Sequence, residues 1–270
     1  MTTQGQSVWL GSARRPVRLA MIGFVGVLAI LIVGQIAGAL FFDTGFGMKE
    51  FLQPHEHTIV LVTEIVGALA LLFTGLYFSD IRGAIEPEPD GFFDIVSLVC
   101  ARIAMVAIAS VVFVMFYEVV SRYVFDKPTL WANELSLWIA GFVFLLAGLY
   151  AMQQRSHIRI YIIYDIMPRW MRKTSDVVSV GLIWGFTFAL IWGGYNEARD
   201  KFFRMETFGT AWDPPIPATV KPAILIIIAM VAIQALSNLI ADWNKAPESH
   251  APIEDIDETE IELIRRTLKD

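Results

Sequence analysis

The sequence predicts an all-α integral membrane protein with about six transmembrane helices. Hydrophobic residues make up 56% of the 270 residues and charged residues only 18%, whereas a typical soluble domain carries about 25% charged residues. The apolar residues form long uncharged stretches separated by short polar ones, which is typical of membrane proteins. The alternating pattern of barrel strands is absent. We therefore expect helices, which satisfy their own backbone polar groups within lipid.

Six stretches are long enough to span a bilayer, because a hydrocarbon core about 30 Å thick needs roughly 20 mostly apolar residues in a helix. The predicted helices cover residues 19–42, 58–78, 92–120, 131–152, 176–195 and 222–243. Arg14, Arg15 and Arg18 precede the first stretch, as basic residues do in a signal peptide. Its apolar run exceeds the roughly 7–15 residues of a signal sequence, so we expect it to stay in the membrane.

An acidic linker divides the chain into two groups of helices. Residues 79–91 read SDIRGAIEPEPDG, and their prolines, glycines and acids indicate a loop. Residues 1–78 would then form an N-terminal extension of two helices, and residues 92–245 a four-helix core. Residues 246–270 form an acidic tail that we expect to be solvated, with docking on a partner as the alternative. No internal repeat indicates the inverted halves of many self-sufficient transporters.

The polar segments between helices indicate the orientation of the chain. Thirteen Lys and Arg residues fall on the side of the N-terminus and seven on the opposite side. The excess of positive charge predicts that both termini are cytoplasmic. Residues 161–173, YIIYDIMPRWMRK, are amphipathic and rich in Tyr, Trp and Arg. They favour a short helix in the cytoplasmic interface, with a simple loop anchored by its aromatic residues as the alternative.

Ionisable residues within spans are costly in lipid and are therefore candidates for function. Glu64 lies in the second predicted helix and Arg102 in the third. They could pair with each other, face a partner subunit, or reach toward the nearer interface. The residues alone leave these three alternatives open.

The sequence carries no pattern of an enzyme or a metal site. It has no phosphate-binding loop, no nucleophile elbow and no H-E-x-x-H motif, so we expect neither catalysis nor a cofactor. Cys100 is the single cysteine, and His55 and His57 form only a short HEH motif in a loop. None of the histidines lies inside a predicted helix, where haem in a membrane bundle usually finds its ligands. No basic patch indicates nucleic acid as a partner.

The most informative stretch is RYVFDKPTLWANELSLW, residues 122–138, between the third and fourth predicted helices. Trp131, Glu134 and Trp138 recur at helical spacing and would share one face. Glu134 would lie near the start of the fourth helix, where the helix dipole favours an acid. Arg122 and Glu134 could bridge the turn.

These residues resemble the small (Q-type) membrane subunit of tripartite ATP-independent periplasmic (TRAP) transporters. The resemblance rests on RYVF at residues 122–125, on Pro128, on Trp131 followed by Glu134, and on SHIRI at residues 156–160. It covers roughly residues 92–243, and the order and spacing of the motifs are more specific than any one of them. The chain departs from the family pattern at Asn133, where a second acid is common, and at Ser156, where Gly is common. The first two helices are additional to the usual four.

The resemblance implies an accessory role in secondary transport. A periplasmic solute-binding protein would deliver the solute, an organic acid in many members, to a large membrane subunit driven by a sodium gradient in the bacterial inner membrane. The small subunit would pack against the scaffold of the large one and help dock the binding protein. Carried over to this sequence, the resemblance assigns the ordering of one turn to Arg122, Tyr123, Trp131 and Glu134. It assigns the ordering of the opposite turn to His157 and Ile158.

Two other functions remain as alternatives. A membrane-anchor subunit of a respiratory enzyme would need haem-ligating histidines inside helices. A self-sufficient small transporter or channel would normally show broken helices or several polar groups at mid-membrane. A haem spectrum would test the first alternative, and solute uptake by the isolated chain in liposomes would test the second.

Overall fold

The computed structural model describes residues 7–42, 45–52, 56–81, 83, 86, 89, 91–155 and 167–244. Within these residues every regular element is helical, as predicted. The elements are η1 (Gly11–Ala13), α1 (Arg14–Phe41), α2 (Met48–Leu52), α3 (Thr58–Ser79), α4 (Phe92–Tyr123), α5 (Ala132–Gln153), α7 (Arg169–Phe203) and α8 (Ile216–Asp242). The six helices other than η1 and α2 are long and apolar enough to cross a membrane, which confirms the predicted fold class.

The observed helices extend several of the predicted ones. α7 begins at Arg169 and ends at Phe203, so it is longer at both ends than the predicted residues 176–195. Residues 169–173, which we assigned to a separate interfacial helix, form the first turn of α7, and residues 161–166 lie outside the described residues. α8 begins at Ile216 and contains Pro222. A proline is tolerated within a transmembrane helix because neighbouring groups can satisfy the backbone carbonyl that it leaves without a donor.

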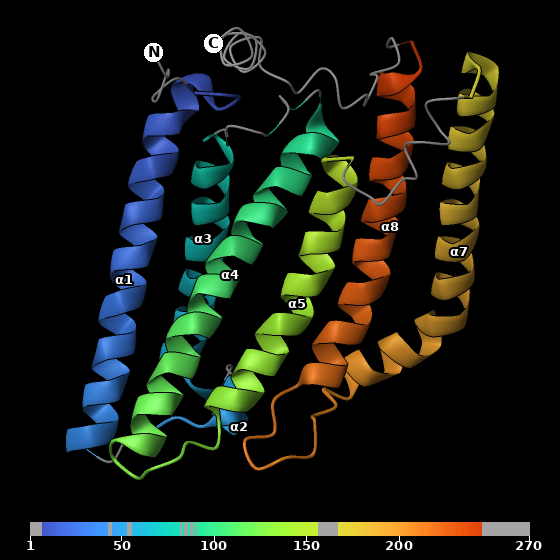
Figure 1. Ribbon diagram of the computed structural model, residues 1–270. Helices are drawn as coiled ribbons and strands as arrows, with labels where there is room; N and C mark the ends of the chain where they lie inside the picture. Colours follow the sequence, from blue (N-terminus) through green and yellow to red (C-terminus); the bar gives the residue numbers. More distant parts are fainter. Residues whose placement is uncertain are drawn as a thin grey trace, which may run out of the picture.

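The six long helices stand in a single row rather than in a closed bundle. Along the row the order is α1, α3, α4, α5, α8 and α7, and each helix packs mainly on its immediate neighbours. Figure 1 shows this row with α3 set behind α1 and α4. Small side chains lie where the helices approach one another: Ala132, Ala218 and Ala232 are fully buried. Close approach through small residues is how helices pack in lipid, where apolar burial offers little driving force.

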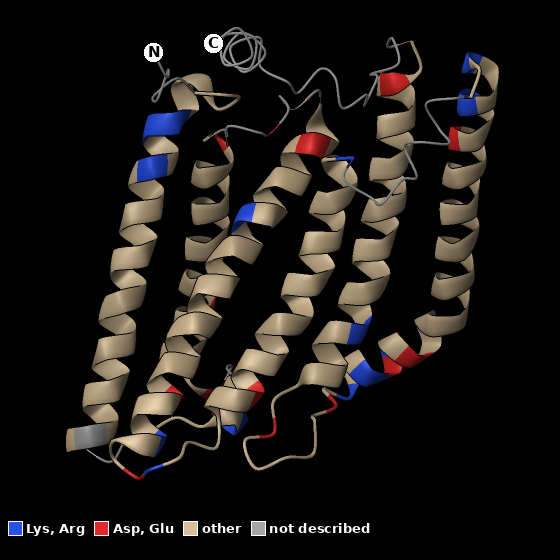
Figure 2. Cartoon of the chain, viewed as in Figure 1, with Lys and Arg blue, Asp and Glu red and all other residues tan. Residues whose placement is uncertain are grey.

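The two ends of the row carry different connections (Figure 1). One end, which we call the terminal end, holds η1, the end of α3, the start of α4 and the end of α8. The other, the turn end, holds α2, the α4–α5 turn at residues 124–131 and the α7–α8 loop at residues 204–215. Figure 2 shows the charged residues gathered toward these two ends, with few between them.

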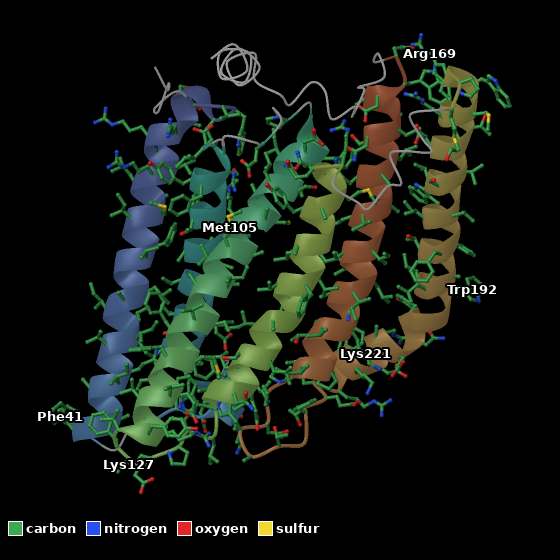
Figure 3. The ribbon with its side chains drawn as sticks, in the orientation of Figure 1. Phe41, Met105, Lys127, Arg169, Trp192 and Lys221 are labelled. Carbon is green, nitrogen blue, oxygen red and sulfur yellow. The ribbon has the colours of Figure 1, made fainter. Side chains whose placement is uncertain are left out.

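α7 bends sharply near the turn end. Trp192 lies at the bend (Figure 3), and Gly193 and Gly194 follow it directly. Adjacent glycines are a recognised cause of such kinks. A Cβ atom at Gly194 would lie 3.3 Å from Leu225 Cδ2, so the missing side chain also lets α7 approach α8 closely. Beyond the bend, the charged part of α7 runs obliquely toward the start of α8 (Figure 2).

Candidate functional site at the α4–α5 turn

The α4–α5 turn is ordered by its own hydrogen bonds. The Lys127 N–H donates to the Ser121 carbonyl at 2.9 Å, and the Ser121 hydroxyl donates to the Lys127 carbonyl at 2.5 Å. Asp126 lies between them with a φ of 53°. This left-handed conformation is uncommon outside glycine, and Asp and Asn tolerate it best. The polypeptide chain therefore reverses direction within a few residues after α4.

Glu118 is the residue that joins the two helices across this turn. Its side chain is buried, with a relative exposure of 4%. It accepts hydrogen bonds from Arg122 Nε at 2.9 Å, from Arg122 Nη2, from the Thr129 N–H at 3.0 Å and from the Thr129 hydroxyl. Thr129 Oγ1 in turn accepts a hydrogen bond from the Ala132 N–H at 3.4 Å, at the first residue of α5. The carboxylate thus fixes the end of α4 to the beginning of α5.

Arg122 and Glu134 do not bridge the turn, so that interpretation was wrong. Arg122 pairs with Glu118, which lies one helical turn before it on the same face of α4. Glu134 lies in the first turn of α5, as predicted, and accepts a hydrogen bond from the Thr210 hydroxyl at 2.7 Å. Arg122 therefore pairs with Glu118, the acid nearer to it in sequence, and Glu134 contacts the α7–α8 loop instead.

The tryptophans predicted to share one face of α5 contact different helices. The Trp138 indole N–H donates to the Thr219 hydroxyl of α8 at 2.7 Å. Trp131 precedes α5 and stacks on Tyr117 of α4, with ring centroids 5.7 Å apart. Tyr123, the last residue of α4, is 79% exposed. Two of these three aromatic residues therefore connect neighbouring helices, and Tyr123 points outward.

Ion pairs hold the bent part of α7 against α8 at the same end. Lys221 of α8 pairs with Glu197 of α7, and Lys201 pairs with Glu206 in the loop. The Ala218 N–H donates to the Glu206 carbonyl at 3.3 Å. A half-open hollow of about 450 Å³ lies beside the α4–α5 turn and is lined by Tyr117, Val120, Ser121, Phe125 and Lys127. The turn end therefore combines ordered loops with exposed aromatic and basic side chains.

Arg102 is engaged at the terminal end and does not pair with Glu64. It is 9% exposed and forms an ion pair with Glu86 of the linker at 2.5 Å. It also donates to the carbonyls of Phe78 and Ile81, at 3.2 and 3.1 Å, just where α3 ends. The Tyr150 hydroxyl of α5 donates to the other oxygen of Glu86 at 2.6 Å. Four segments of the chain, α3, the linker, α4 and α5, meet at this cluster.

The pKa of Glu86 is lowered by these contacts. Burial alone would raise it, because burial disfavours the charged form. The donors Arg102 and Tyr150, together with the Gly83 N–H at 2.8 Å, outweigh the burial. Glu86 therefore remains ionised and supplies the negative charge that Arg102 needs in a buried position.

A second carboxylate fixes the N-terminal segment. Asp80 is fully buried and accepts hydrogen bonds from the N–H groups of Trp9 and Leu10, at 2.9 and 3.0 Å, and from the Ser7 hydroxyl at 2.8 Å. Its other oxygen lies 3.3 Å from Arg14 Nε. Burial raises the pKa of Asp80, but the hydrogen bonds from these three residues and the charge of Arg14 outweigh burial and lower it. The segment before α1 is thereby attached to the end of α3.

Side chains with amide, hydroxyl and carboxyl groups form a buried network between α4 and α8. Gln234 donates to Asp94 at 2.6 Å and to Asn238 at 2.9 Å, and it accepts from the Ser97 hydroxyl at 2.9 Å. Asn238 donates to the Met152 carbonyl of α5 at 2.7 Å. All five residues lie near the terminal end. These partners satisfy polar groups that would be costly in an apolar surrounding.

Some of the predicted residues lie outside the described part of the chain. His157 and Ile158 are among these, as is His55. His57 lies at the N-cap of α3 with its ring 5.4 Å from that of Phe46. Within the described ranges no group of three or more His, Cys, Asp or Glu side chains is placed to hold a metal ion.

Comparison with known proteins identifies the family of the chain. A sequence profile of the family described as "Tripartite ATP-independent periplasmic transporters, DctQ component" matches residues 111–245, which is half of the chain. The chain belongs to this family. It is therefore a small permease component of a TRAP transporter, as the resemblance over residues 92–243 predicted, and it is not an enzyme.

Three curated relatives show similarity over parts of their length. The C4-dicarboxylate TRAP transporter small permease protein DctQ of Vibrio cholerae is 27% identical over 81 residues, which are 30% of this chain and 35% of the relative. The sialic acid TRAP transporter small permease protein SiaQ of the same species is 27% identical over 109 residues, which are 37% and 59% of the two chains. The sialic acid TRAP transporter permease protein SiaT of Haemophilus influenzae is 26% identical over 122 residues, covering 45% of this chain and 20% of the relative. The chain thus spans less than two thirds of each relative.

The family match includes the α4–α5 turn and leaves out α1 and α3, which pack on each other as an N-terminal hairpin. It begins within α4, includes Glu118 and Thr129, and continues past the end of α8. Sequence reasoning missed Glu118, although its spacing of four residues before Arg122 was a visible signal of a helical ion pair. It also missed Glu86, for which the linker sequence gives no comparable signal, because its partners Arg102 and Tyr150 are distant in sequence.

Proposed function

We propose that this chain is the scaffold subunit that packs beside the large permease of a sodium-coupled TRAP transporter. The observation that carries this proposal is the single row of helices, in which each helix packs mainly on the next one along the row and α4 also meets α8 near the terminal end. A row one helix thick encloses no solute path of its own, whereas self-sufficient transporters place the solute between two helix groups. Its apolar side chains remain exposed on the long helices, and they suit contact with lipid and with a membrane-embedded partner.

The predicted orientation would put the turn end in the periplasm. The positive charge in the connecting segments favours cytoplasmic termini. At the terminal end, Arg14 and Arg169 begin α1 and α7, and Arg155 follows the end of α5. With both termini on the cytoplasmic side of the inner membrane, the α4–α5 turn and the α7–α8 loop would face the periplasm. These ordered loops would then help to dock the solute-binding protein. The hydrogen bond between Glu134 and Thr210 would hold the two loops together.

The solute class is an organic acid. The names of the relatives specify a C4-dicarboxylate in one case and sialic acid in two. Both solutes carry carboxylate groups. The large permease and the binding protein would select the solute, and this chain would stabilise their assembly.

A mild-detergent purification of the tagged chain from its native membranes tests the proposal. We expect a much larger multi-helix permease to co-purify in about equal amount, and the binding protein to join when its solute is present. Recovery of the chain alone, or together with redox proteins, would contradict the proposed role. Uptake of a labelled organic acid by liposomes that hold the complex, driven by a sodium gradient, tests the energy coupling. Liposomes with this chain alone serve as the control.

A further inference from the structure

Glu64 is an acidic residue within a membrane span. It lies in α3, six residues after the helix begins at Thr58, which corresponds to about 9 Å along the helix axis. Its side chain is half-buried. A carboxyl group at this depth is costly unless it meets a donor, and acids in transmembrane helices almost always pair with another group.

The structure records a partner for every other acid in the six long helices. Asp94 accepts from Gln234, Glu118 from Arg122, and Glu134 from Thr210. Glu197, Asp200 and Asp242 pair with Lys221, Arg204 and Arg155, and Asp176 also makes a polar contact. Within the described ranges Glu64 has neither a hydrogen bond nor an ion pair. Arg102, which the sequence suggested as a partner for Glu64, forms an ion pair with Glu86 instead.

The neighbouring polar groups of α1 and α3 already have hydrogen-bond partners within the chain. Gln35 of α1 donates to the Thr63 hydroxyl at 2.6 Å, and that hydroxyl donates to the Ile59 carbonyl at 2.7 Å. Around the axis of α3, at 100° per residue, Glu64 lies about 60° from Gly67. Gly67 faces Leu28 of α1. The Glu64 carboxyl therefore lies beside the contact between α1 and α3, and part of its surface is open to a group from outside the chain.

We propose that Glu64 receives a hydrogen-bond donor, an Arg or Lys or a hydroxyl or amide group, from a transmembrane helix of the large permease. The inference rests on the proposed function, which supplies a membrane-embedded partner. Lipid chains offer no donor at this depth, so charge complementarity selects a protein side chain. The residues that match the family profile begin at 111, so α3 lies outside them. The N-terminal hairpin thus adds a contact with the permease beyond those of the four-helix core.

Photo-crosslinking in the whole transporter tests where Glu64 points. A photoreactive phenylalanine analogue is placed at position 64 or at position 62 in the full chain, and cross-linked peptides are identified by mass spectrometry. Val62 is the matched control, because it is 39% exposed and lies about 160° around the same helix. We expect position 64 to cross-link to the large permease and position 62 to lipid. Cross-links from position 64 to lipid alone, or to a second copy of this chain, would overturn the inference.

Substitution of Glu64 tests whether the permease donates a hydrogen bond to its carboxyl group. We expect E64A to reduce the amount of co-purified permease by about tenfold in stringent detergent, the ratio that loss of one charge-assisted hydrogen bond produces. E64K should reduce it further by repulsion, and V62A should leave it unchanged. Equal recovery of the permease with E64A and wild type would contradict the inference. If wild type itself recovers no permease, the proposed function fails instead, so the two failures are distinguishable.

Discussion

Glu118 shows how a single side chain can fix the geometry of two helices. It accepts hydrogen bonds from Arg122 and Thr129 while it is almost completely buried. Removing one partner of a buried charged pair leaves the other without compensation, which costs more than the pair itself contributes. The residue therefore controls the angle at which the chain leaves α4 and enters α5.

We expect E118Q to lower the thermal unfolding midpoint of the purified chain by a few degrees. The amide keeps the shape of the side chain but loses the charge that Arg122 requires, and one of its two polar ends can no longer accept hydrogen bonds. E134Q is the matched control, since Glu134 accepts one exposed hydrogen bond from Thr210. The midpoint is measured in the same detergent for all three proteins. A larger fall in the unfolding midpoint for E134Q than for E118Q would be inconsistent with this account.

Asp80 makes the attachment of the segment before α1 dependent on pH. Its pKa is lowered below the usual value of 3.8, so its contribution to stability is present above that value and is lost as the pH falls through the lower folded pKa. At neutral pH we expect D80N to reproduce this loss. The amide N–H groups of Trp9 and Leu10 would then exchange with deuterium much faster than in wild type, whereas those within α3 would not change. Unchanged protection of Trp9 and Leu10 in D80N would exclude Asp80 as the anchor.

The place of a residue within a helix was predictable where the signal is local in sequence. Glu134 lies in the first turn of α5 as expected, because its position relative to Pro128 and Trp131 indicates a helix start. The pairing of Arg102 with Glu86 was not predictable, because it depends on where Glu86 of the linker lies relative to α4. Hydropathy locates the arginine within a span but carries no information about a partner in a loop.

At the scale of helices, two glycines of α3 differ in what surrounds them. A Cβ atom at Gly75 would lie 2.8 Å from Ile103 Cγ1 and 3.3 Å from Val99 Cγ1 of α4. A Cβ atom at Gly67 would lie 3.7 Å from Leu28 Cδ1, which is an ordinary contact. Only Gly75 is therefore required for the close approach of its neighbouring helix.

We predict that G75A destabilises the chain by about 1–3 kcal/mol, the usual cost of overpacking a well-packed contact. The added methyl group has no space unless α3 and α4 move apart. G67A should be neutral or slightly stabilising, since alanine restricts the unfolded chain more than glycine does. Unfolding of the two variants in a denaturing detergent titration, followed by helical circular dichroism, measures the difference. Equal stability of G75A and G67A would show that the α3–α4 contact is looser than described.

The length of α7 illustrates why helix ends were predicted less well than helix centres. Hydropathy ends the apolar stretch near Tyr195, where charged residues begin. The helix nevertheless continues to Phe203, because Glu197 pairs with Lys221 of α8 and the bend at Gly193 and Gly194 turns the charged part away from the apolar run. The ion pair is a tertiary contact, so a count of apolar residues cannot detect it.

For the whole molecule, the number of spans was predictable and their order in space was not. Each long helix is apolar over most of its surface, so its sequence does not indicate which side meets a neighbour. The order α1, α3, α4, α5, α8 and α7 follows instead from specific contacts between helices, such as Trp138 with Thr219 and Gly75 with Ile103. A single row also explains why few large side chains are fully buried.

Disulfide cross-linking in native membranes tests this order. Cys100 is the only cysteine of the chain, so C100A provides a background into which pairs can be introduced. Gly75 with Ile103 reports on α3 and α4, and Gly141 reports on α5 and α8 because its added Cβ would lie 3.4 Å from Val220 Cγ2. These distances end at a Cγ atom, which is one bond from the Cβ of its own residue. The two Cβ atoms of each pair therefore lie within about 5 Å of each other, and a disulfide needs Cβ atoms about 3.5–4.5 Å apart.

We expect the cysteine pairs at 75 and 103 and at 141 and 220 to form disulfides within one chain on mild oxidation. A pair at Gly23 of α1 and Gly181 of α7 should form none within one chain. These glycines lie on the two outermost helices of the row, and an added Cβ at either would meet no atom within 4 Å. Mass spectrometry of peptides from monomeric protein separates disulfides within a chain from those between chains. A disulfide between positions 23 and 181 within one monomer would mean that the row closes into a bundle. The scaffold would then present one outer surface to the permease and to lipid, instead of the two broad faces that a row offers.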